Sequence, residues 1–163
     1  MIFSFIVRRL RWLARVPLVP QVFDAFLLAW TALFHHERFV ALEALEAQAL
    51  QLPGVQPRRH RFGGTGFARA GCEFAHFHGN GLLDVHLGRK CADVVVAAGL
   101  ASPHHVFRSS AWVSFWVRSK VDLPQAMSLV NMGASRERGL QHRGFSWPRD
   151  EISSSFGQSD STR

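Results

Sequence analysis

The chain has 163 residues, which is long enough for one domain with a hydrophobic core, and its apolar content of 47% is normal for a globular protein. Its formal charge is +7. No stretch interleaves basic and aromatic residues as a single-strand nucleic-acid groove would, so we predict a membrane surface, and no nucleic acid, as the partner of this charge. Cys72 and Cys91 lack the spacing of a metal site and favour a reducing compartment without a disulfide.

Residues 1–34 form an apolar and basic segment with helical periodicity. Its charge comes from four arginines, Arg8, Arg9, Arg11 and Arg15. The apolar run at 22–34 is interrupted by Asp24 and is shorter than the roughly 20 residues that span a bilayer. We interpret this segment as a candidate membrane anchor with its arginine-rich end in the cytoplasm, which places the protein at the cytoplasmic membrane. The alternative is a helical pair that simply packs on the domain.

Residues 35–133 carry the pattern of an α+β domain. A helix is predicted from Glu37 to Leu52, then a strand, a glycine turn and a strand over 57–71. A β-hairpin follows at 73–87, a helix at 89–98, and a strand at 111–118. The last helix runs from Asp122 to about Met132 and is expected to end at Gly133. Residues 134–163 are polar and are expected to be a disordered tail. This order predicts an antiparallel β-sheet with helices mainly on one face, preceded by N-terminal apolar helices.

The hairpin at 73–87 has two alternating runs around Gly79-Asn80-Gly81. A two-residue turn would pair Phe77 with Asp84 and place a charge on the apolar face. A three-residue loop with Gly81 in the left-handed conformation instead puts Ala75, Phe77, Leu83, Val85 and Leu87 on one core face, so burial favours it. That register pairs His78 with Leu82, His76 with Asp84, and Phe74 with His86.

The same register gathers titratable side chains on the second face of the sheet. The residues that converge there are His76, His78, Asp84 and His86, opposite a core face of Ala75, Phe77, Leu83, Val85 and Leu87. Strand alternation at 111–118 adds Trp112 and Trp116 to the polar face. Glu73 falls on the other face by this alternation, and we assign it a structural hydrogen bond.

Several of these residues stand in an order and spacing that resembles the fungal luciferase domain. The shared pattern is Glu73-x-Ala75-His76-x-His78, then His86-Leu87, then Gly99, His104 and Trp112. The resemblance covers roughly residues 72–134. It implies an enzyme that oxidises a hydroxylated pyrone with molecular oxygen, without a metal or organic cofactor, at a membrane. The present chain is shorter, and Asp84 stands where the fungal domain has a hydroxyl residue.

On this basis we predict a cofactor-independent oxygenase acting on a small aromatic or enolic molecule. The catalytic candidates are His76, His78, Asp84 and His86, and the substrate-binding candidates are His104, Trp112 and Trp116. His76 or His78 would be the general base, Asp84 would orient its ring, and the tryptophans would form an aromatic wall.

Two alternatives stay open at this point. The same imidazoles and carboxylate suit Zn²⁺ or Fe²⁺, or the domain could bind a ligand without catalysis. No role is assigned to the other histidines, His35, His36, His60, His105 and His142.

Overall fold

The computed structural model describes residues 19–60 and 63–141. Residues 1–18 of the predicted apolar and basic segment, and residues 142–163 of the expected tail, therefore lie outside the described residues. The helices are α2 Val19–Phe34, α3 His36–Leu50, α4 Arg89–Ala97, the 3-10 helix η2 Lys120–Asp122, and α5 Leu123–Gln141. The strands are β1 Val55–Arg59, β2 Thr65–Arg69, β3 Cys72–Phe77, β4 Leu82–His86, β5 Ser102–Pro103, and β6 Trp112–Trp116.

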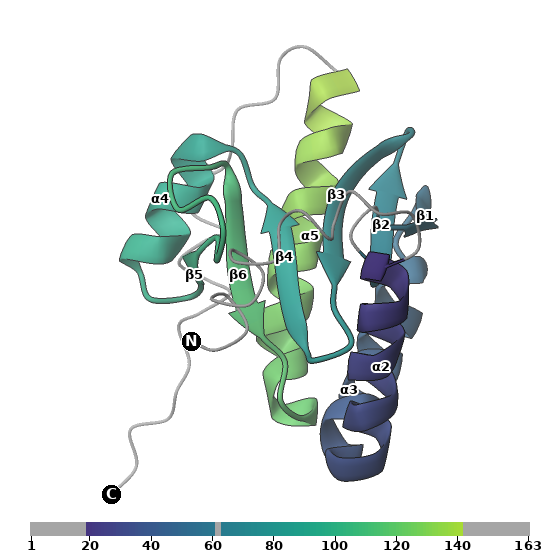
Figure 1. Cartoon of the computed structure of the whole chain (residues 1–163). Coiled ribbons are helices and arrows are strands. Elements are labelled where there is room, and N and C mark those ends of the chain that lie inside the picture. The colour runs from purple at the N-terminus through teal and green to yellow at the C-terminus, as the bar shows by residue number, and fades with distance from the viewer. Residues whose placement is uncertain (1–18, 61–62, 142–163) are drawn as a thin grey trace, which may run out of the picture.

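The strands form one antiparallel six-stranded sheet in the order β1-β2-β3-β4-β6-β5. The predicted α+β class is therefore confirmed. Helices α3 and α5 lie behind the sheet in Figure 1 and contact each other, and α5 also contacts β3 and β4. The strands β3, β4 and β6 are central neighbours, so side chains from three separate segments meet on each face.

The β3–β4 register is the predicted one. Ala75, His76 and Phe77 pair with Val85, Asp84 and Leu83, respectively. The loop closes as expected, because the His78 N–H donates to the Leu82 carbonyl (2.9 Å) and Gly81 has a φ of 91°. A side chain at position 81 would be strained in this left-handed conformation. The three-residue loop and the alternation of side chains along β4 together decide which face Asp84 occupies.

A β-bulge at Phe74 in β3, directly before Ala75, breaks the alternation of side chains between the two faces of the sheet. Phe67 pairs with Ala75, but the next residue of β2, Ala68, pairs with Glu73, so Phe74 is the extra residue. An extra residue in one strand reverses the facing of the residues that follow it. Phe74 is consequently buried in the core, and Glu73 contacts histidines on the polar face. The prediction that Glu73 lies away from the histidines, and the predicted Phe74–His86 pair, are wrong for this reason.

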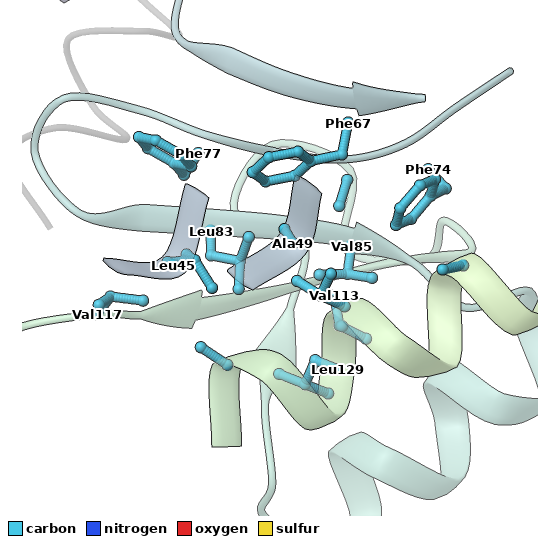
Figure 2. Close-up of a cluster of buried hydrophobic side chains, with 14 of the residues drawn as sticks. Leu45, Ala49, Phe67, Phe74, Phe77, Leu83, Val85, Val113, Val117 and Leu129 are labelled. Carbon is cyan, nitrogen blue, oxygen red and sulfur yellow. The ribbon is translucent and has the colours of Figure 1, made fainter. Parts of the chain in front are cut away.

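The hydrophobic core fills the space between the sheet and helices α3 and α5. Figure 2 shows Leu83, Val85 and Val113 of the central strands directed towards Leu129 of α5. Leu45 and Ala49 supply the α3 side of the same cluster. Full burial of one such large side chain stabilises a fold by roughly 1.5–3 kcal/mol, so this face holds the domain together.

Helix α5 is longer than predicted, because Gly133 does not end it. The helix continues to Gln141, where a polar tail was expected from residue 134. A Cβ built on Gly133 would lie 2.8 Å from Val85 Cγ1 and 3.0 Å from Phe74 Cδ2. The missing side chain lets α5 approach the sheet, and this packing offsets the roughly 1 kcal/mol that glycine costs in a helix.

Helix α2 has an inverted distribution of polar and apolar side chains. Its two buried residues are Asp24 and Thr31. Its exposed large apolar residues are Val22, Phe23, Phe26, Leu28, Trp30, Leu33 and Phe34. Within the described ranges, no helix combines the length and the apolar character needed to cross a bilayer.

Cys72 and Cys91 form no disulfide.

Candidate functional site

Asp84 of β4 is the centre of the polar face and is completely buried. Its strand neighbours are His76 on β3 and Ser114 on β6, whose hydroxyl donates a hydrogen bond to Asp84 Oδ1. The second oxygen, Oδ2, lies 3.4 Å from both His76 Nε2 and His105 Nδ1 and accepts no hydrogen bond. Burial favours a neutral carboxyl, but the adjacent His105 and His76 hold the pKa of Asp84 well below its usual range.

Glu73 binds two stacked histidines on the β2 side of the face. The ring of His60, which follows β1, lies 3.6 Å from the ring of His76 (centroid to centroid) and nearly parallel to it. Glu73 Oε1 is 2.6 Å from His60 Nδ1 and 3.0 Å from His76 Nδ1. The short contact identifies Nδ1 of His60 as the protonated nitrogen, so its Nε2 carries the lone pair.

The pKa values of these two imidazoles are shifted in opposite directions. Burial lowers the pKa of His60 and outweighs the hydrogen bond to Glu73. Burial also acts against a charged His76, but Asp84 and Glu73 on its two sides raise its pKa overall. For Glu73, burial is offset by the hydrogen bond with His60 and by the nearby ring of His76, which lower its pKa to about 2. At neutral pH this arrangement favours an ionised Glu73 and a neutral His60.

His78 lies at the end of β3, where the hairpin meets α2. Asp24 Oδ1 of α2 is 3.3 Å from His78 Nδ1 and also accepts a hydrogen bond from the Gly79 N–H (3.0 Å). A Cβ on Gly79 would lie 2.5 Å from the backbone nitrogen of Leu28, so only glycine lets α2 come this close. The buried Asp24 that interrupts the apolar run of α2 is thus part of the polar face.

His104 is fixed by the loop that follows β5. Its Nδ1 accepts hydrogen bonds from the backbone N–H groups of Val106 and Phe107 (3.2 and 3.0 Å). The proton of the neutral ring is therefore on Nε2, which lies 3.9 Å from Asp84 Oδ1. Burial is the main cause that lowers the pKa of His104 to about 4. The Nε2–H group therefore lies near Asp84 but is too far from it for a direct hydrogen bond.

Trp112 separates His86 from the other histidines. Its ring centroid lies 5.3 Å from that of His76 and 5.1 Å from that of His86. The Nδ1 atom of His86 is 2.8 Å from Arg136 Nη1 of α5, and burial together with this cation lowers the pKa of His86. His86 shares the face as expected but stands apart from Asp84. Trp116 pairs with Leu82 on the same face and is half-exposed.

Sequence reasoning missed Glu73, His60, His105, Ser114 and Asp24 as members of this site. Ser114 could have been found, because alternation places it between Trp112 and Trp116. The sequence gives no comparable signal for His60 or His105, since each lies just beyond a strand end where the period of two no longer applies. Asp24 is 55 positions from the hairpin backbone that it binds.

Residues 71–133 match the family model of the luciferase domain. The resemblance drawn from the histidine pattern is therefore confirmed over this segment, which contains the hairpin, α4, β6 and most of the α5 core contacts. No curated protein and no solved structure matches the chain.

Proposed function

We propose that this luciferase-domain protein is an oxygenase that acts on a small enolic or aromatic molecule with O₂. The observation that carries the proposal is the pair of Glu73 and His60, 2.6 Å apart, beside the stacked ring of His76. A carboxylate that fixes Nδ1–H of an imidazole leaves Nε2 to accept a proton from a substrate. His60 is also less buried than His76, so it is the more accessible base.

The proposed reaction has two steps. The proton of the substrate enol or phenol passes to His60 Nε2 and leaves an electron-rich anion. The electron pair of the anion then forms a carbon–oxygen bond with O₂, so the substrate is oxidised and O₂ is reduced to a bound peroxide. Trp112 supplies an aromatic wall for a planar substrate, and burial of the polar face excludes water from the anion.

Oxygen uptake by the full-length protein with a panel of hydroxypyrones and polyphenols tests this function. His60→Ala is expected to lower the rate about 10²–10⁴-fold, which is the usual contribution of a general base. Glu73→Gln should lower it less, because His60 keeps its nitrogen but loses its orienting charge. The matched control is His36→Ala on the exposed side of α3.

The alternative is a domain that binds its ligand without catalysis. Ligand binding without oxygen uptake in the parent protein would decide for that alternative. So would a His60→Ala variant that consumes oxygen as fast as the parent. Far-UV circular dichroism of each variant excludes loss of fold as the cause of a lower rate.

We also propose that the exposed apolar face of α2 holds the protein at a membrane surface. Support comes from its inverted pattern, with polar residues buried and aromatic residues outside, directly after the arginine-rich residues 8–15. Aromatic and basic side chains together favour the interface of an anionic bilayer. The full-length protein should float with anionic vesicles, and the double variant Phe26→Ser, Leu33→Ser should float less. Equal flotation of parent and variant would refute this.

A further inference from the structure

Three side chains at the centre of the polar face have the composition of a metal site. His76, His78 and Asp84 are all buried, and each offers one ligand atom within 4.8 Å of those of the other two. Imidazole nitrogen and carboxylate oxygen are ligands of Zn²⁺ and other divalent first-row metals, and three protein ligands leave a position open. His76 and Asp84 lie on adjacent strands, which are rigid supports, and His78 directly follows β3.

An unsatisfied buried oxygen points to a bound cation. Asp84 Oδ2 is buried and accepts no hydrogen bond, although the imidazoles of His76 and His105 each lie 3.4 Å away, and a buried oxygen without a hydrogen bond is costly. Its distance to His76 Nε2 is 3.4 Å. Two ligands at about 2.0–2.1 Å from a tetrahedral metal are about 3.3 Å apart, so this separation suits coordination to one ion.

Each of the two histidines also has a carboxylate at its other nitrogen. Glu73 Oε1 lies 3.0 Å from His76 Nδ1, and Asp24 Oδ1 lies 3.3 Å from His78 Nδ1. Metal-binding histidines commonly have such a partner, which fixes the ring and makes the Nε2 ligand more basic. The pattern occurs twice in this site, on residues from β3 and from α2.

Two overlapping groups of donors fit a metal less well. His104 offers the Nε2 that carries its proton, because its Nδ1 accepts two backbone hydrogen bonds. His60 and Glu73 are 2.6 Å apart, which is a hydrogen bond and is too close for two ligands of one ion. His86 belongs to neither group, since it lies beyond Trp112, where it contacts Arg136.

We propose that the protein binds one divalent first-row transition-metal ion, Zn²⁺ or Fe²⁺, through His76 Nε2, His78 Nε2 and Asp84 Oδ2. The metal site does not rest on the proposed oxygenation, since His60, the base of that reaction, is not a ligand. Glu73 and Asp24 are positioning residues that act through the two histidines. The resemblance to the fungal domain implied no metal, so this site is a point of difference.

Titration of the chelator-treated full-length protein with Zn²⁺, with Co²⁺, and with Fe²⁺ under anaerobic conditions tests the site by calorimetry. We expect one ion per chain, and the metal retained on purification, measured by mass spectrometry, distinguishes zinc from iron. Asp84→Asn and His78→Gln should abolish the stoichiometric binding. Glu73→Gln should weaken it about 10–100-fold, as loss of an outer carboxylate does. His36→Gln and Asp93→Asn, both exposed, are matched controls that should bind like the parent.

X-ray absorption of the zinc-loaded parent tests the ligands without any variant. Two imidazoles and an oxygen ligand in the first shell are expected. The proposal is overturned if none of the three metals binds stoichiometrically, if the spectrum lacks two imidazoles, or if folded Asp84→Asn binds as tightly as the parent. Oxygen uptake by metal-free protein is measured separately, so failure of the metal site and failure of the oxygenase remain distinguishable.

Discussion

The central sheet buries both of its faces, but with opposite chemistry. Leu83 and Val85 point into the apolar core, and Asp84 between them points into a cluster of histidines, although all three are completely buried. The apolar face stabilises the fold through the hydrophobic effect. On the polar face, the cost of burying charges can exceed the attraction between them, so this face is expected to add less stability than the apolar face.

The largest effect is expected on the apolar face. Phe67→Ala should lower the free energy of unfolding by about 3–5 kcal/mol, because it leaves a cavity in a fully buried part of the core. Urea denaturation measures the change. The exposed Val121→Ala is the control and should stay within about 0.5 kcal/mol of the parent. A loss below 1 kcal/mol for Phe67→Ala would contradict the assignment of this face as the main source of stability.

On the polar face, Ser114→Ala should have a smaller effect. It removes the hydroxyl that donates to Asp84 Oδ1 and should cost about 1.5–3 kcal/mol, the range for a hydrogen bond to a charged group. The measurement is urea denaturation of the metal-free protein, with exposed Ser102→Ala as the control. If Ser114→Ala is as stable as Ser102→Ala, the carboxylate does not depend on this bond.

A substitution at the contact between the hairpin and α2 tests whether this contact holds α2 against the polar face. Gly79→Ala would place a Cβ 2.5 Å from Leu28 N and 2.8 Å from the Asp24 carbonyl, so α2 has to move away. Overpacking of this kind costs about 1–3 kcal/mol. Hydrogen exchange should show faster opening of α2 while α5 keeps its protection. Unchanged exchange in α2 would mean that the helix is not held by this turn.

The sequence predicted those features that depend on neighbouring residues. The register of β3 and β4 follows from Gly79-Asn80-Gly81 and the period of two, and it correctly placed Asp84 opposite His76. Gly99 ends α4 in the left-handed conformation, as expected for a glycine after a short helix. In both places local chain chemistry and burial favour the same structure.

Features that depend on distant contacts were missed. The facing of Glu73 is set by how β3 pairs with β2, and the length of α5 is set by the packing of Gly133 against Val85 and Phe74. His60 is brought to the site only when β1 takes its place at the sheet edge. No periodic pattern within a single segment contains this information, so the sequence predicted only part of the candidate site.

The β-bulge in β3 also constrains how the chain can change in evolution. One residue inserted in β2 between Phe67 and Ala68 would give Phe74 a partner and remove the bulge. Phe74 would then turn to the polar face, and Glu73 would turn into the core. Insertions and deletions in β2 and β3 should therefore be tolerated less than substitutions. Relatives that keep the Glu73 carboxylate are expected to keep the length of both strands.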